Sequence, residues 1–262
     1  MIDFGPFDHY MFAALGLVGT AAGAVGLIWL ANHSRYAEWI HSYRGVAPNF
    51  LSVIGVLFAL NLVFLANDTW HAHDQALDAV YKEAGALSGI VALADQLPAP
   101  VRSKVNATVR TYARLAVTTE WPLLGQRESS AEAAAELDTL LGLLASADVG
   151  RTLDSSVHSV ILQQAVQVRT MRDLRVSLCQ THVNPLKWLG MAFLGFLMMV
   201  SIVMVHVDQP KGELLAVLLF AASAGPTAAI VLIQGNPFQQ PTAVTSAPIA
   251  AMAAPLTISR SP

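Results

Sequence analysis

The chain has 262 residues and a formal net charge of −3, and it is 54% hydrophobic but only 13% charged. Soluble domains carry about 25% charged residues, so the composition does not fit an ordinary soluble protein, and the absence of a polybasic region argues against a nucleic-acid-binding surface. The single cysteine, Cys179, excludes an intrachain disulfide. We expect this thiol to be half-buried and inert rather than exposed and reactive.

Charged residues are missing from four long apolar stretches, which cover residues 11–31, 50–67, 188–207 and 214–234. About 20 apolar residues are needed to cross the hydrocarbon core of a bilayer, so the pattern predicts four transmembrane helices. Gly225-Pro226 can kink the last helix without breaking it. The first ten residues contain two Asp and no Lys or Arg, unlike the start of a signal peptide, so we expect the first span to be retained.

The second span predicts a helix that continues far beyond the membrane. No glycine or proline interrupts residues 61–84, and the apolar positions of 77–94 recur at steps of three and four residues. One helix from about Asn49 to Gln96 would be roughly 70 Å long. The "LPAP" motif at 97–100 should end it, because proline cannot continue the backbone hydrogen bonds.

Three more helices are predicted in the polar middle of the chain. The first covers 101–120 and is expected to stop at Trp121-Pro122. The second covers about 129–146, where Ser129 or Ser130 can cap a helix whose apolar side is formed by four leucines. The third covers about 152–182, and Gln164 and Arg175 interrupt its apolar side. No strand-like alternation competes, so the predicted fold is all-α.

The predicted organisation has four parts. Residues 1–67 form the first two spans, 68–183 an extramembrane helical bundle, 184–234 the last two spans, and 235–262 a tail. Asn184-Pro185 should start the third span, with Asn as the cap and proline in the first turn. The tail is rich in Pro, Ser and Thr, and we expect it to lack a fold of its own and to lie against other parts of the chain.

A face of small residues marks the first span, and it consists of Gly16, Gly19, Gly23 and Gly26. Small residues let transmembrane helices approach closely. The face could pack against another copy or line a pore, or it could pack against the other spans of the same chain. The second explanation is slightly favoured, because such faces occur in most helix bundles.

The orientation in the membrane is nearly undetermined by charge. Arg35, Arg44 and Lys211 in the short inter-span loops favour loops inside and the middle domain outside. Basic residues near the ends of the second and third spans favour the opposite orientation; these are Lys82, Arg169, Arg172, Arg175 and Lys187.

Catalytic or metal-binding chemistry is weakly indicated. In the stretch "DTWHAHD" (68–74), His71 and His73 point to nearly opposite sides of a helix, whereas Asp68, His71 and Gln75 share a face. That face could hold a metal or a proton, but a polar surface just outside the membrane explains it more simply. No hydrolase, metalloprotease, P-loop or dinucleotide motif is found, so we expect no enzyme, no metal and no cofactor.

The second span carries the residues of greatest functional interest. Asn61 lies in the middle of an apolar span, where it would line an ion pathway or form a hydrogen bond between helices. Val56, Leu60 and Phe64 form an apolar row at steps of four, and Phe64 and Asn61 also share a face with Leu57 and Asp68. Several copies of this row around an axis would form a constriction that gates ions by dewetting. Contact with lipid or a neighbouring helix is the simpler explanation of such a row.

Several short motifs, in order, resemble the bacterial bestrophin-like family of unknown function. The run from residue 70 to 125 carries most of them, "VRTMRDLR" (168–175) resembles the arginine-containing helix of the family, and "GNPFQQPTAVTSAPI" (235–249) resembles its end motif. The matching residues are Trp70, Asp74, Ala76, Glu83-Ala84, Leu97-Pro98, Tyr112-Ala113, Glu120-Trp121-Pro122 and Pro237-Phe238. Gly235-Asn236 and Gln239-Gln240 depart from the pattern, so any role of the acidic-basic pair or of the Ser-Gly turn is in doubt.

The resemblance implies distant kinship with bestrophin anion channels, which are pentamers whose second span lines an apolar neck. It therefore strengthens the pore interpretation of the second span and implies a homo-oligomer in a bacterial inner membrane that conducts small inorganic ions. Bestrophins keep the middle domain in the cytosol, whereas the loop charges slightly favour a middle domain outside. The alternative function is a membrane-anchored interaction or sensory module that conducts nothing and uses its helical domain to bind a partner.

Overall fold

The structure is a computed structural model that describes residues 8–35, 38, 47–180, 185–206, 208–240 and 242–254. The described residues form helices and connecting turns without any strand, which confirms the predicted all-α class. Four of these helices are long and apolar enough to cross a membrane, as predicted. The chain divides into two compact units, 1–71 with 182–235 and 72–181 with 236–262.

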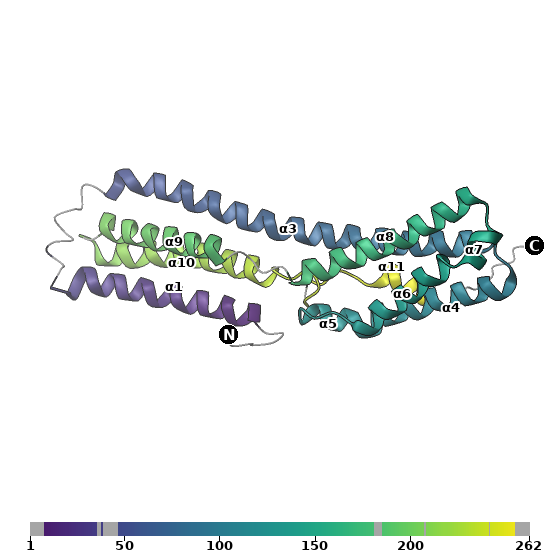
Figure 1. Cartoon of the computed structure of the whole chain (residues 1–262). Helices are drawn as coiled ribbons and strands as arrows, with labels where there is room; N and C mark the ends of the chain where they lie inside the picture. The colour runs from purple at the N-terminus through teal and green to yellow at the C-terminus, as the bar shows by residue number, and fades with distance from the viewer. Residues whose placement is uncertain are drawn as a thin grey trace, which may run out of the picture. The chain divides into compact units, whose positions relative to one another are not determined.

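Unit 1 contains the apolar helices. These are α1 (Asp8–His33), the first half of α3 (Ala47–Ala94), α9 (Pro185–His206) and α10 (Pro210–Ile233) (Figure 1). Helices α1, α9 and α10 contact one another. A Cβ atom at Gly225 would lie only 2.9 Å from Leu17 Cδ2, so a larger residue there would displace the end of the Leu17 side chain where α1 contacts α10. Pro226 lies inside α10 without ending it, as the sequence predicts.

The predicted long second helix is confirmed. α3 contains 48 residues without a break, which at 1.5 Å per residue is roughly 70 Å of continuous backbone. The chain therefore passes from the apolar residues of unit 1 into unit 2 with no reverse turn between Ala66 and Asp74. Each peptide group in this stretch keeps its helical partner, so no polar backbone is exposed where the sequence changes from apolar to charged.

Unit 2 packs the second half of α3 with α4 (Ala99–Leu115), α6 (Ala131–Leu144), α7 (Ala147–Thr152), α8 (Ser155–Gln180) and α11 (Ala247–Ala253). The Ser130 hydroxyl accepts a hydrogen bond from Ala133 N and caps α6, as expected. The core is continuous and contains apolar side chains from every one of these helices. Examples are Val80, Leu87, Ile90, Val109, Tyr112, Leu137, Leu140, Val149, Ile161, Val168 and Ile249.

One boundary prediction in unit 2 is wrong. Trp121-Pro122 does not stop the helix predicted over 101–120, because α4 passes through the π-helical turn η2 (Ala116–Glu120) into α5 (Trp121–Gly125). Pro122 lies in the first turn of α5, where its missing N–H is tolerated. The helix predicted over about 152–182 corresponds to α8, and the short helix α7 before it was not predicted; the non-helical residues Leu153 and Asp154 separate the two.

The tail is also more ordered than predicted. α11 forms within it, and Phe238, Val244 and Ile249 are buried in the core of unit 2. The expectation that the tail lacks a fold of its own is therefore wrong for these residues, whereas the expectation that it lies against other parts of the chain is correct. The Asn184 cap predicted for the third span lies outside the described residues.

Candidate functional site

One face of α3 in unit 1 is exposed, and it contains the predicted apolar row. Val56 is 59% exposed, Leu60 49% and Phe64 64%. Leu57, predicted on the same side, is 49% exposed. Because these positions recur at steps of three and four, they form one continuous apolar surface along the span.

The opposite face of α3 packs against α9 and α10. Leu65 and Ala66 are buried against Met191 and Val231. The Phe58 ring lies 5.5 Å from that of Phe220. α3 therefore uses one side to join the bundle and presents the other side outward.

Asn61 lies apart from the exposed apolar row. Its side chain is half-buried and faces α9, because a Cβ atom placed on Gly190 would be 3.5 Å from Asn61 Nδ2. This position favours a contact between helices over a place on the exposed face. The small Gly190 leaves room for the amide group.

A polar turn continues the exposed face where the apolar stretch ends. Asn67, Asp68 and His71 are exposed there. Lys187 Nζ lies 2.5 Å from Asp68 Oδ2, and both side chains are about half exposed. The carboxylate is therefore neutralised by an ammonium group from the start of α9. Trp70, also on α3, donates a hydrogen bond from Nε1 to Gln234 Oε1 at 3.3 Å.

The glycine face of α1 makes little contact with its own chain. A Cβ atom at Gly23 would lie 3.6 Å from Met199 Cε, but none at Gly16, Gly19 or Gly26 would have a neighbour within 4 Å. Own-chain packing therefore accounts for only one of the four glycines among the described residues.

The sequence analysis did not identify a buried carboxyl group in unit 1. Glu213, in the first turn of α10, is fully buried and accepts a hydrogen bond from Asn32 Nδ2 at 2.9 Å. This contact joins α10 to α1. A carboxyl group in an apolar helix end is costly to bury without a partner, so Asn32 stabilises the position of Glu213.

The most densely bonded site is a buried ion cluster in unit 2, formed by Glu83, Tyr112, Glu120, Arg172 and Arg175. Arg175 Nε donates to Glu83 Oε2 at 2.6 Å, and its Nη2 donates to Glu83 Oε1 at 2.9 Å. Tyr112 Oη donates to Glu83 Oε1 at 2.6 Å. Glu83, Tyr112 and Arg175 are fully buried. Glu83 on α3 is thus bonded to the Tyr112 hydroxyl of α4 and, through two hydrogen bonds, to the Arg175 guanidinium of α8.

Glu120 joins the cluster to the start of α6. Arg172 Nη2 donates to Glu120 Oε1 at 2.5 Å and to the Ser130 carbonyl at 3.0 Å. Arg175 Nη2 lies 3.3 Å from Glu120 Oε2. Glu120 ends the π-helical turn η2, which shifts the helical register and directs this carboxylate into the core.

The tail reaches the cluster through aromatic rings. The Arg175 guanidinium lies 5.2 Å from the centre of the Trp121 ring, and Trp121 contacts Phe238 edge-on with ring centres 5.5 Å apart. Asn236 Nδ2 donates to the Leu124 carbonyl at 3.1 Å, and Asn236 Oδ1 accepts from Phe238 N at 3.0 Å. Asn236, one of the departures from the family pattern, thus shapes this turn with its own side chain.

The cluster is electrostatically balanced, because two guanidinium groups face two carboxylates. Burial by itself would lower the pKa of Arg175, but the charge and hydrogen bonds of Glu83 outweigh it and hold that pKa above its ordinary value. Burial, together with the nearby Glu83 carboxylate, raises the pKa of Tyr112 well above its ordinary value. Arg175 stays charged and Tyr112 stays neutral, so the arrangement serves to hold helices together.

Some of the residues that carry the family resemblance meet in the ion cluster, and others lie far from it along α3. Glu83, Tyr112, Glu120, Trp121 and Arg175 converge in the cluster, and Phe238 contacts it through Trp121. The Pro237 carbonyl accepts a hydrogen bond from Val244 N. Trp70 and Asp74 lie elsewhere on α3 and are exposed.

Sequence reasoning took Arg175 for an interruption of the apolar side of a helix, whereas it is the largest fully buried side chain among the described residues. The available signal was the spacing of Arg172 and Arg175, which places two arginines on one otherwise apolar face.

Cys179, next to the cluster on α8, is buried. Burial, reinforced by the Glu120 charge, raises its pKa to about 11. We expect slow reaction with a thiol reagent at pH 8, with a rate that increases about tenfold for each pH unit because the thiolate is the reactive species. Absorbance with Ellman's reagent measures this, and denatured protein is the fully reactive control; rapid reaction of the native protein at pH 8 would contradict the prediction.

The described residues contain no group of three or more His, Cys, Asp and Glu that could hold a metal ion. In the DTWHAHD stretch, His71 is exposed and His73 half-buried.

Comparison with known proteins gives one family and one fold. The model of the bestrophin-like domain matches residues 18–249. No curated protein matches the chain. A crystal structure of a bacterial bestrophin homologue from Klebsiella pneumoniae, in a single-residue mutant form, has a TM-score of 0.63 at 13% identity and covers 92% of this chain and 96% of its own.

Two further solved structures share the fold. The Klebsiella pneumoniae homologue solved with zinc phasing has a TM-score of 0.57 at 13% identity, with 92% of this chain and 94% of the other covered. A structure described only as a membrane protein has a TM-score of 0.65 at 13% identity and covers 92% and 96%. The four apolar helices, the order of the elements and the match over most of the chain agree, and the protein is a membrane protein that belongs to the bestrophin-like family.

Proposed function

We propose that this protein is an oligomeric ion channel of the bacterial inner membrane, not an enzyme, and that the exposed face of α3 lines its pore. The observation that carries the proposal is the apolar row of Val56, Leu60 and Phe64, exposed on a helix whose other side packs into its own bundle. Kinship with bestrophin anion channels supports the same function and suggests five copies and permeant anions.

Physical chemistry supports this use of the row. An apolar ring in a narrow pore empties of water, and the dry segment is a barrier to ions. On the same face, Asn67, Asp68 and His71 follow the row by one to two turns, so polar groups would begin where the constriction ends. An ion that leaves the constriction would therefore meet polar side chains, which can replace part of its hydration shell, within one to two helical turns.

The deciding test is ion flux from liposomes that contain the purified protein, combined with the mass of the detergent-solubilised particle. A channel predicts a ring-forming oligomer and measurable flux. A monomer or dimer that stays silent when pH, voltage and calcium are varied would instead support the non-conducting interaction module.

Replacing Phe64 with alanine should raise the flux several-fold, because the smaller side chain widens and wets the constriction. Phe193→Ala is the matched control, since Phe193 on α9 is 59% exposed and undergoes the same chemical change on another helix. Equal flux through wild type and Phe64→Ala, in oligomers of equal mass, would remove Phe64 from the pore.

A further inference from the structure

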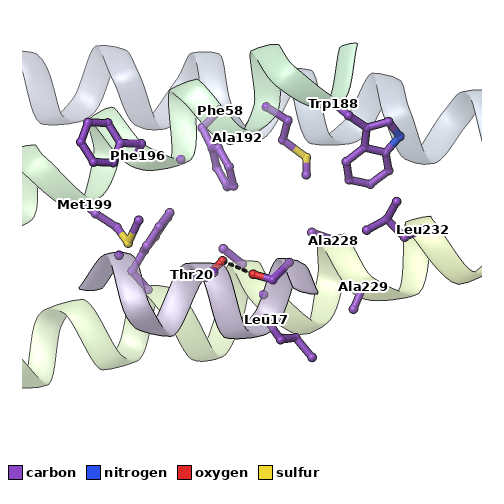
Figure 2. Close-up of a pocket in the computed structure, with 18 residues that line it drawn as sticks. Leu17, Thr20, Phe58, Trp188, Ala192, Phe196, Met199, Ala228, Ala229 and Leu232 are labelled. Atoms are coloured by element: carbon purple, nitrogen blue, oxygen red, sulfur yellow. Dashed lines mark hydrogen bonds between the residues drawn. The ribbon is translucent and has the colours of Figure 1, made fainter. Parts of the chain in front are cut away.

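An elongated apolar cavity of about 350 Å³ lies inside unit 1. Side chains from α1, α3, α9 and α10 line it, and Figure 2 shows Phe58, Phe196 and Met199 on one part of its wall and Trp188 with Leu232 on another. Gly16, Gly19 and Gly23 form the α1 wall. From Trp188 to Met199 the cavity follows α9 for 11 residues, which is roughly 16 Å of helix.

The polar groups around this cavity are few. The hydroxyl group of Thr20 already donates to the Gly16 carbonyl at 2.7 Å, as the dashed line in Figure 2 shows. Trp188 contributes its ring to the wall, but its Nε1 is itself buried and does not open onto the cavity. The cavity therefore suits an apolar ligand along its whole length.

The position of Trp188 in the chain agrees with this chemistry. It follows Lys187, whose ammonium group pairs with Asp68 where the apolar part of α3 ends. Trp188 is thus at the level where apolar residues give way to charged ones. In membranes, tryptophan favours this interfacial level, which is where the ester carbonyl groups of phospholipids lie.

We propose that the cavity binds one acyl chain of a membrane phospholipid, with the ester end of that chain at the level of Trp188. An empty cavity inside a membrane bundle lacks the contacts that stabilise packed helices. An acyl chain is the apolar molecule present at high concentration beside these helices, and it supplies those contacts. This inference does not depend on ion conduction.

The test is native mass spectrometry of the full-length protein after detergent exchange and addition of phosphatidylglycerol. Wild type should retain phospholipid, and Gly19→Leu should lower the retained amount at least tenfold, because the leucine side chain fills the cavity. Gly26→Leu is the matched control: it makes the same change on the same helix, also without neighbours within 4 Å of the new Cβ, but outside this cavity.

A second variant fills the cavity from another wall. Ala192→Leu enlarges a small lining residue of α9 and should lower the retained phospholipid in the same way as Gly19→Leu. This variant decides the matter if Gly19→Leu fails to fold, which the thermal midpoint would reveal.

Three results would overturn the proposal. In the first, folded Gly19→Leu retains as much phospholipid as wild type. In the second, Gly19→Leu reduces the oligomer mass but not the lipid content, which would show that the cavity receives a second copy of the chain. In the third, the retained molecule is a fatty acid or a quinone without a glycerophosphate group.

Discussion

Replacing Arg175 with methionine is expected to destabilise unit 2 by about 3–5 kcal/mol, because the Glu83 carboxylate would remain buried without its bidentate partner. For a chain of this size the thermal midpoint should fall by on the order of 10 °C. Glu120 would lose one of its two arginines but keep Arg172. The midpoint of the detergent-solubilised full-length protein, followed by tryptophan fluorescence, measures the effect.

Arg169→Met is the matched control on the same helix. Arg169 pairs with Asp138, but both side chains are about half exposed, and an exposed ion pair contributes about 0–1 kcal/mol. The control should therefore change the midpoint by a few degrees at most. Similar thermal midpoints for the two variants would show that the buried cluster contributes no more to the free energy of unfolding than an exposed ion pair does.

Removing both charges of the central pair should be less harmful than removing one. In Glu83→Gln combined with Arg175→Met, no carboxylate remains unpaired at Glu83, and Tyr112 can still donate to the new amide oxygen. We expect the double variant to recover part of the stability lost in Arg175→Met, as a double-mutant cycle would show.

Removing Lys187 or Asp68 should change the ion preference of the proposed pore in opposite directions. Lys187→Gln leaves the Asp68 carboxylate unpaired at the end of the apolar row, so permeability should shift toward cations. Asp68→Asn leaves the ammonium group unpaired and should shift permeability toward anions. One charge at about 4 Å in water is worth about 1 kcal/mol, so each shift should be about fivefold.

Reversal potentials in asymmetric salt measure these shifts in planar bilayers. The double variant Asp68→Asn with Lys187→Gln should return toward the wild-type ratio, because the net charge is again zero. Lys104→Gln, an exposed lysine on α4, is the control for loss of one positive charge. The shifts should shrink in 1 M salt, where charges are screened over about 3 Å. Conducting variants with an unchanged ratio would exclude this pair from selectivity without excluding the channel.

The sequence by itself determined the membrane character and the helix inventory of this protein. The four spans follow from stretches without charge. The unbroken helix from Ala47 to Ala94 follows from apolar spacing and from the lack of glycine and proline at 61–84, where the sequence changes from apolar to charged. Both signals are local, because hydrophobic length and helical periodicity are properties of neighbouring residues. The apolar row on α3 was visible for the same reason, since its members lie four residues apart.

Only the tertiary structure decided which polar residues are buried and what they bond. Glu83 and Arg175 are 92 residues apart, and Arg172 and Glu120 are 52 apart. A charged residue has the same letter in a sequence whether water or a partner neutralises it, so burial of Arg175 could not be read from its helix. The ordered tail has the same physical reason, because Phe238 is buried against a ring that is distant in the sequence, Trp121.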